Sequence, residues 1–294
     1  MRNNPVKQHT VPKTYLKHFS HNGRNIFVYD KNKKTIEERN IKSVSIIKDF
    51  YTVTDTDTQE KMYDMENLLG QDIEPFYNPI IDLIEKKEIL YDAHKKAFSF
   101  FIAAQLLRSP KIKRQVLEEI EVSFRNGIEG NIFDSKYLNI FKQTFSADDR
   151  KISYEEYLEN KDNDDIKITI DISDDCYIQY LPHKISNLAE EIESKEWTFL
   201  LAPNKRSFIT SDNPIFSPKD FSEIPIGRLE GDIFVLTKRL ALMMGKNYGY
   251  IDVNLKEVKA INQCIHLNSD QFIFSHNKEL LCKNIKNVNN KAIV

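Results

Sequence analysis

The stretch AHKKAFSFFIAAQLLRSP, residues 93–110, is the most apolar predicted helix of the chain, and it decides the kind of fold that is possible. Its apolar side chains recur at spacings of three and four residues, the period of an α-helix. The same spacing continues through MENLLGQDIEPFYNPIIDLIEKKEIL (65–90) and IKRQVLEEIEVSF (112–124). We therefore predict a block of helices from Met65 to about Gly127.

Segments with β character lie towards the two ends of the chain. Runs of this kind occupy residues 25–30, 35–40, 166–172, 197–201, 207–210, 231–245 and 271–276. The first two flank a polar turn and predict a hairpin, while LKEVKAINQCIHLN (255–268) predicts a further helix. This order favours an α+β fold, in which a helical central region packs against mostly antiparallel strands contributed by the N- and C-terminal parts.

We expect residues 1–294 to form a single domain, with residues 128–182 as an acidic, variable insertion or lid within it. Asp171 and the pair Asp174–Asp175 could bind a divalent cation through oxygen ligands, although such acidic loops more often bind nothing. The cofactor stays open, with a divalent metal ion as one candidate.

Composition excludes several classes of protein. With 294 residues, a net charge of −2 and 40% hydrophobic residues, the chain can bury a large core. No apolar run approaches the roughly 18 residues of a membrane span, and the basic start MRNNPVKQHT lacks the apolar segment of a secretory signal, so we expect a cytoplasmic protein with no membrane partner. The three cysteines, 176, 264 and 282, support neither a disulfide framework nor a zinc site.

The segment KQHTVPKTYLKHF, residues 7–19, places polar and aromatic side chains close together. Thr10 before Val11-Pro12 predicts a helix N-cap, with Tyr15, Leu16 and Phe19 on the core-facing side. Gln8 and His9 then lie just outside the helix. His9 is either part of a capping arrangement or the wall of an active site, and Lys7, Lys13 and Lys17 form a basic arm that could meet phosphate or simply face solvent.

Gln105 and Arg108 lie three residues apart, and therefore on one face of the apolar helix. A buried guanidinium without an anion is strongly destabilising. Arg108 should therefore pair internally, for instance with Glu66 or Glu74, or bind a phosphate. The residues favour neither alternative.

The segment FITSDNPIF ends a β run at Ser211, Asp212, Asn213 and Pro214. Asp and Asn before proline are ordinary turn residues. An Asp at the end of a core strand is also how many enzymes present a metal ligand or a general base on a rigid support. In the predicted C-terminal helix, Asn262 is the polar residue that could join such a site.

Familiar catalytic and nucleotide-binding motifs are absent. The chain has no G-x-x-x-x-G-K-[ST], no G-x-G-x-x-G after a strand, no H-E-x-x-H and no G-x-S-x-G. With eight glycines in all, a glycine-rich phosphate loop is not expected.

Taken in order, these motifs resemble the bacterial domain-of-unknown-function 4238 family. Its opening Q-H-x-x-P-x-x-Y-L-x-x-F is matched by Gln8, His9, Pro12, Tyr15, Leu16 and Phe19, its central Q-x-x-R-[ST]-P by Gln105, Arg108, Ser109 and Pro110, and its S-D-N-P by Ser211–Pro214. Asn262 fits the final helix, and residues 128–182 lie outside the matched motifs. Some members of the family are associated with defence against phage, which implies an effector that acts on nucleic acid or a nucleotide.

Our leading hypothesis is that the motifs converge on one pocket that cleaves a phosphodiester in RNA or DNA. His9 would act as general acid or base, Asp212 would position His9 or hold a metal, and Arg108 would stabilise charge on the phosphate. Orientation of the substrate is assigned to Gln8, Tyr15, Gln105, Ser211, Asn213 and Asn262, and contacts to the nucleic-acid backbone to Lys7, Lys13 and Lys17.

Two alternatives stay open. The same pocket could belong to a non-catalytic sensor that binds a nucleotide or a phage protein. The motifs could instead form a buried polar network that specifies the fold, with the interaction surface in the acidic insertion. The oligomeric state is not predicted.

Overall fold

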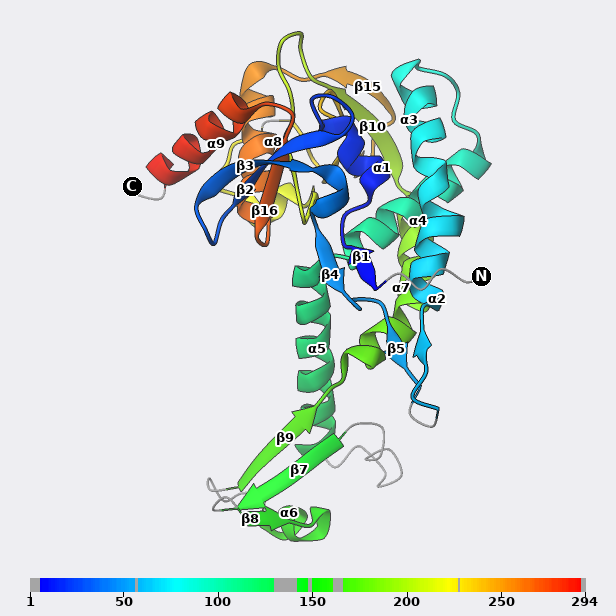
Figure 1. Cartoon of the computed structure of the whole chain (residues 1–294), viewed down its shortest axis with the longest axis vertical. Coiled ribbons are helices and arrows are strands. Elements are labelled where there is room, and N and C mark those ends of the chain that lie inside the picture. Colours follow the sequence, from blue (N-terminus) through cyan, green and yellow to red (C-terminus); the bar gives the residue numbers. More distant parts are fainter. Residues whose placement is uncertain are drawn as a thin grey trace. The chain divides into compact units, whose positions relative to one another are not determined.

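The computed structural model of the chain describes residues 6–55, 58–129, 142–147, 150–160, 166–226 and 228–291 (Figure 1). The chain forms two compact units. The first unit combines residues 1–111 with residues 181–294, and the second comprises residues 112–180.

The first unit opens with a short pairing of two strands. Strand β1 (Lys7–His9) pairs antiparallel with β4 (Ile46–Lys48). The chain then enters α1 (Lys13–Leu16) and η1 (Lys17–Phe19). Thr10 is not the N-cap that the sequence predicted: the helix begins after Pro12 with no side-chain cap. Instead, the amide and hydroxyl of Thr10 both donate to the Ser45 carbonyl, at 2.9 and 3.3 Å, which extends the β1–β4 pairing.

A four-stranded antiparallel sheet joins the two ends of the chain. The predicted hairpin is present as β2 (Asn25–Asp30) and β3 (Thr35–Asn40). β16 (Phe272–Ser275) pairs with β2, and β11 (Thr210–Ser211) pairs with β16. Strands from the N- and C-terminal parts therefore share one sheet; the sequence predicted strands in both parts but not their pairing.

A five-stranded sheet has the order β12-β13-β14-β10-β15. Its strands are β10 (Glu196–Leu201), β12 (Ile215–Phe216), β13 (Asp232–Val235), β14 (Leu240–Gly245) and β15 (Gly249–Asp252). All neighbours are antiparallel except β10 and β15, which run parallel. The single run predicted at 231–245 is thus two strands, because Thr237 closes a tight turn by accepting the amides of Arg239 and Leu240.

The predicted block of helices is present and contains an irregular stretch. Its elements are α2 (Asp64–Asn67), the π-helical η3 (Leu68–Ile73), η4 (Glu74–Phe76), α3 (Tyr77–Glu85), α4 (Asp92–Leu107) and α5 (Pro110–Glu129). Short elements precede it: η2 (Ile41–Ser43), β5 (Val53–Thr54) and β6 (Lys61–Met62).

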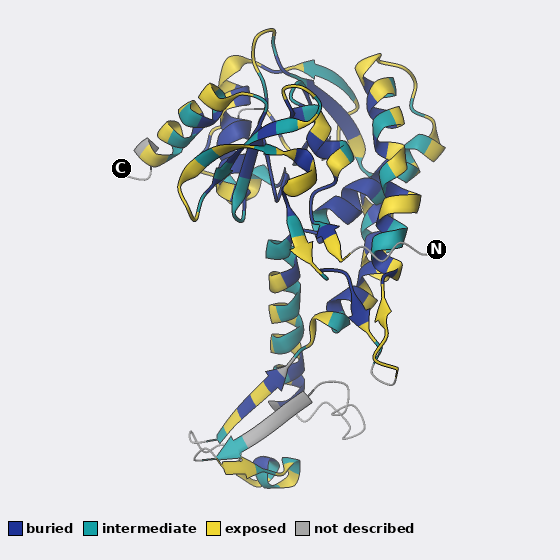
Figure 2. Ribbon diagram, in the orientation of Figure 1, coloured by how far each residue is buried: buried dark blue, intermediate teal, exposed yellow. Residues whose placement is uncertain are grey.

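Helix α4 is buried on several faces (Figure 2), which explains its almost continuous apolar sequence. Phe98 and Phe101 of this helix pack on Tyr77, and the Tyr77 ring lies 5.8 Å from that of Tyr15. Phe98 also meets Trp197 of β10 edge to face, at 5.9 Å between ring centroids. The core of the first unit therefore lies between the helices and the five-stranded sheet.

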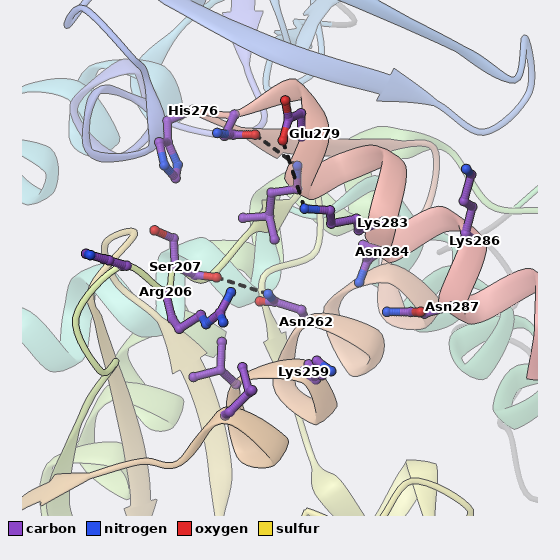
Figure 3. Close-up of a pocket in the computed structure, with 15 residues that line it drawn as sticks. Arg206, Ser207, Lys259, Asn262, His276, Glu279, Lys283, Asn284, Lys286 and Asn287 are labelled. Atoms are coloured by element: carbon purple, nitrogen blue, oxygen red, sulfur yellow. Dashed lines mark hydrogen bonds and ion pairs between the residues drawn. The ribbon is translucent and has the colours of Figure 1, made fainter.

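The C-terminal part contains two helices. Helix α8 (Leu255–Asn268) has the predicted bounds, and a capping box between Asn254 and Glu257 sets its start. A last helix, α9 (Lys278–Lys291), was not predicted from the sequence. Together α8 and α9 border a cavity (Figure 3). The remaining described helices are α7 (Asp174–Ser194), which begins in the second unit and continues into the first at residue 181, and η6 (Pro218–Phe221).

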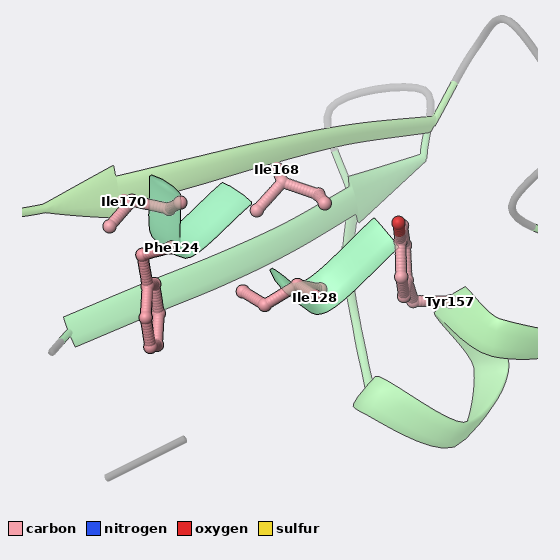
Figure 4. Close-up of a cluster of buried hydrophobic side chains, with 5 residues drawn as sticks. All are labelled: Phe124, Ile128, Tyr157, Ile168 and Ile170. Atoms are coloured by element: carbon pink, nitrogen blue, oxygen red, sulfur yellow. The ribbon is translucent and has the colours of Figure 1, made fainter. Parts of the chain in front are cut away.

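The second unit has its own hydrophobic cluster, formed by Phe124, Ile128, Tyr157, Ile168 and Ile170 (Figure 4). These side chains come from α5, α6 (Tyr154–Asn160) and β9 (Ile166–Asp171). β7 (Lys142–Ala147) lies between β8 (Arg150–Ile152) and β9 in an antiparallel sheet. The unit begins at residue 112 because the later turns of α5 contribute to its core. The insertion at residues 128–182 stays a prediction.

The two units together give an α+β fold, with helices and mostly antiparallel sheets. Within the described ranges, no helix is both long enough and apolar enough to cross a membrane.

Candidate functional site

Gln8 is fully buried in β1 and is used inside the protein. Its Nε2 donates to Thr52 Oγ1 at 2.9 Å, and its Oε1 accepts the Tyr51 amide. The Tyr51 hydroxyl in turn donates to the carbonyl of Arg108, at 3.4 Å. Gln8 therefore ties the first motif to the residue that ends α4.

His9 follows at the end of β1 and is half-buried. Its Nε2 atom is buried and has no hydrogen-bond partner among the described residues. Burial, together with the nearby charges of Lys13 and Arg108, lowers the pKa of His9 to about 4, against the opposing effect of the Lys42 backbone. At neutral pH the imidazole is therefore uncharged and can accept a proton.

Arg108 is 2% exposed and meets a carboxylate, as the sequence required. Its Nη1 lies 3.0 Å from Glu74 Oε1, which is one of the two internal partners considered from the sequence. Although burial disfavours the charge, Glu74 and its neighbours raise the pKa of Arg108. The Nε of Arg108 is buried without a partner among the described residues, so the guanidinium keeps one donor unused.

Glu66 also faces Arg108. Burial raises the pKa of Glu66 to about 7, with a further contribution from Glu74, while Arg108 and Lys13 oppose the rise. Glu66 and Glu74 lie on either side of the π-helical η3. Such π segments are frequent at functional sites.

Gln105 lies one turn before Arg108 on the same face of α4 and is 1% exposed. Neither its Oε1 nor its Nε2 has a hydrogen-bond partner among the described residues. We call His9, Glu66, Glu74, Gln105 and Arg108 the Arg108 cluster. It joins the first two motifs and combines a neutral base, a carboxyl that titrates near pH 7, and a cation with a free donor.

Asp212 belongs to a different arrangement. Its Oδ1 accepts the Asp270 amide at 2.9 Å, and its Oδ2 accepts the amides of Gln271 and Phe272 at 2.7 and 2.8 Å. Burial raises its pKa to about 6, although the three amides favour the charged form. In the described part of the chain it makes no hydrogen bond or ion pair with His9 or Arg108, so the predicted convergence of all three residues is not observed. The turn interpretation of this motif accounts for every hydrogen bond of the carboxylate.

The neighbours of Asp212 are also engaged, except for Asn213 Oδ1, which is buried without a partner among the described residues. Ser211 Oγ accepts the Asn213 amide at 3.2 Å, and Asn213 Nδ2 donates to the Asn268 carbonyl, also at 3.2 Å. Asn268 Nδ2 donates back to the carbonyls of Asn213 and Ile215, at 2.9 and 2.7 Å. We call residues 211–213 with Asn268 and 270–272 the Asp212 turn.

Asn262 and Tyr15, both predicted to orient substrate, are used in packing. Asn262 Oδ1 accepts the Ile209 amide at 3.0 Å, and its Nδ2 donates to the Ser207 carbonyl at 3.1 Å. The Tyr15 hydroxyl contacts Thr210 and donates to the Val235 carbonyl. Burial raises the pKa of Tyr15. These contacts hold the N-terminal helix and α8 against the sheets.

The three predicted backbone-contacting lysines, Lys7, Lys13 and Lys17, are exposed. Of these, Lys13 acts electrostatically on His9 and Glu66, and Lys17 borders a separate polar cavity of about 550 Å³. Lys13 is therefore the one that the structure places at the Arg108 cluster.

No group of three or more His, Cys, Asp or Glu side chains able to hold a metal occurs in the described part of the chain. Of the acidic candidates, Asp174 pairs with Lys113 at 2.8 Å. The side chain of Asp171 lies outside the described residues.

A basic cavity of about 430 Å³ between α8, α9 and the loop after β10 was not found from the sequence (Figure 3). Two of its lysines, Lys283 and Lys286, lie on α9. The sequence KELLCKNIKNVNNK does contain a signal for helix α9, since its leucine and isoleucine residues recur at helical spacing. This signal is weak because asparagine and lysine dominate the segment.

Searches for relatives returned one family. No curated protein and no solved structure matches the chain. A family model matches residues 7–279, a range that includes the segment 128–182 left outside the motif resemblance. The chain therefore belongs to the family described as "Protein of unknown function (DUF4238)".

Proposed function

We propose that the chain is a phosphodiester-cleaving enzyme, a nuclease acting on RNA or DNA, with its reaction centre at the Arg108 cluster. One observation carries the proposal: burial moves the pKa values of His9 and Glu66 in opposite directions, to about 4 and about 7, beside the same guanidinium. Pairs of titratable groups whose environments separate their roles in this way are typical of acid–base sites.

The proposed reaction assigns one proton transfer to each group. Neutral His9 accepts the proton of an attacking hydroxyl or water as the new P–O bond forms. Protonated Glu66 donates its proton to the leaving oxygen as the old P–O bond breaks. Glu66 thus takes the acid role, and Asp212 has no part because its oxygens already accept three amides.

The phosphate would meet the free donors of the cluster. Arg108 Nε is available to a phosphoryl oxygen while Nη1 stays paired with Glu74. The buried, unpartnered amide of Gln105 can orient the ester oxygens or the sugar, and the exposed Lys13 adds attraction to the nucleic-acid backbone. The setting, a cytoplasmic effector in defence against phage, rests on expectations from the sequence and the family resemblance.

A non-catalytic sensor is the second candidate. The ion pair between Arg108 and Glu74 favours it, since a guanidinium that is already neutralised can bind a nucleotide without needing to stabilise a transition state. Such a sensor would need neither the neutral His9 nor the protonated Glu66.

The test is cleavage of labelled single-stranded RNA, single-stranded DNA and duplex DNA by the wild-type protein and by His9→Gln and Glu66→Gln. Both variants should lose at least about 100-fold in rate, the size of a lost acid or base. Matched controls are Glu60→Gln and His94→Gln, which change the same residue types outside the cluster and should keep full activity. Binding of an oligonucleotide without cleavage, and unaffected by Glu66→Gln, would support the sensor and contradict the enzyme.

A further inference from the structure

The cavity between α8 and α9 gathers positive charge from three parts of the first unit (Figure 3). Lys205 and Arg206 come from the loop after β10, Lys259 from α8, and Lys283 and Lys286 from α9. Glu279 is the one carboxylate among its described lining residues, and its Oε2 lies 3.9 Å from Lys283 Nζ. Four of the five cations thus have no ion pair in the described part of the chain.

Like charges that line one cavity repel one another, and the repulsion favours binding of an anion in the space between them. The cavity therefore favours an anionic ligand with several negative charges. None of these cations belongs to the Arg108 cluster, so the inference goes beyond the proposed function and does not rest on it.

The walls of the cavity are fixed by contacts beneath them. Asn262 bonds the Ser207 carbonyl and the Ile209 amide, which ties the basic loop to α8. Arg239 Nη1 donates to the carbonyls of Pro203 and Arg206, at 2.5 and 2.9 Å. The loop that carries Lys205 and Arg206 is thus anchored to α8 and to Arg239.

The lining also offers groups for the uncharged part of a ligand. Val258 is buried and Leu280 half-buried, and both supply apolar surface. Nδ1 of His276 is buried and has no partner among the described residues, and its ring borders the cavity (Figure 3). Cations at the rim with apolar and hydrogen-bonding groups inside suit a molecule that has a charged end and a ring system.

We propose that this cavity binds a small phosphate-bearing ligand of nucleotide size that carries two or more phosphates. Its volume of about 430 Å³ falls within the usual range for small-molecule sites, roughly 300–1,000 Å³. A concave site of this size, with apolar residues inside, fits a compact ligand better than an extended nucleic-acid backbone, which prefers a groove lined by cations and aromatic rings.

The test is isothermal titration of the full chain with two probes, inorganic pyrophosphate and ATP. The cavity variant is Lys259→Glu with Lys286→Glu. Its matched control is Lys256→Glu with Lys278→Glu, which makes the same change of charge on the same two helices at exposed positions outside the cavity. We expect ATP to bind the wild type, with affinity falling at least about tenfold in the cavity variant and by no more than about twofold in the control.

Three results would overturn the proposal. The first is that neither probe binds the wild type. The second is an equal loss of affinity in the two double variants, which would mean that only the general field of the protein attracts anions. The third is binding of a single-stranded oligonucleotide through Lys259 and Lys286 without competition from ATP, which would make the ligand a macromolecule. Circular dichroism checks the fold of both double variants. A second test variant is Lys286→Ala, which only truncates an exposed side chain and should also weaken ATP binding.

Discussion

The Arg108 cluster and the Asp212 turn both bury polar side chains of family motifs, yet they differ in how those atoms are satisfied. In the Asp212 turn, both carboxylate oxygens accept backbone amides, and Asn213 Oδ1 is the one side-chain atom among its described residues that is buried without a partner. In the Arg108 cluster, His9 Nε2, Arg108 Nε and both polar atoms of Gln105 are buried without partners among the described residues. An unsatisfied buried polar group costs about 1–3 kcal/mol. We infer that the Asp212 turn maintains the fold and that the Arg108 cluster receives a ligand.

The largest expected effect is on activity. Arg108→Lys keeps a cation beside Glu74 but removes the free Nε donor, so the cleavage rate should fall by about 10²–10³-fold while the protein stays folded. Rates on the preferred nucleic acid and thermal unfolding curves measure the two effects. Full activity in Arg108→Lys would mean that the guanidinium acts only as a structural ion pair.

The opposite result is expected for the Asp212 turn. Asp212→Ala leaves three buried amides without an acceptor and should lower the free energy of unfolding by about 2–5 kcal/mol. Activity per folded molecule should not change. Urea unfolding measures the loss, with Asp220→Ala as the exposed control. A stable but inactive Asp212→Ala would return Asp212 to the reaction centre.

Titration should reveal the shifted pKa values of the two titratable groups assigned to the reaction, Glu66 and His9. The pKa of Glu66 is about 7, above the ordinary value, so its ionisation costs stability increasingly as the pH rises from about 4.5 through 7. Glu66→Gln should therefore stabilise the protein more at pH 8 than at pH 5. NMR titration should place Glu66 near 7 and His9 near 4. Ordinary values for both groups would remove the basis for their assigned roles.

The smallest expected effect concerns Gln105. Gln105→Met replaces a buried amide that has no partners with an apolar side chain of similar size, so stability should rise by up to about 1 kcal/mol. If the amide orients substrate, activity should fall at the same time. A loss of stability would show that Gln105 serves the fold, as the residues of the Asp212 turn do.

Local patterns in the sequence predicted much of this fold. The hairpin of β2 and β3 and the bounds of α8 were visible because alternation, a polar turn and apolar residues at helical spacing are short-range signals. The pairing of Arg108 with Glu74 was one of two predicted partners, since a buried cation near few acids has few options. The α+β class followed from the order of the elements.

The remainder depends on contacts between distant parts of the chain. The S-D-N-P motif suits a turn and a site equally well, and only the amides of residues 270–272 decide between them. The π-helical η3 has no sequence signal of its own. The start of the second unit at residue 112 depends on Phe124 and Ile128 packing with Ile168 and Ile170, which no local pattern reveals.

The most direct test of the central claim is the rate of nucleic-acid cleavage as a function of pH, for the wild type and for Glu66→Gln. The wild-type rate should rise through about pH 4 as His9 loses its proton and fall above about pH 7 as Glu66 loses its own. Glu66→Gln should be at least about 100-fold slower and should lack the alkaline fall. Cleavage with the same pH profile in both proteins, or no cleavage at any pH, would contradict the assignment of the Arg108 cluster as an acid–base centre.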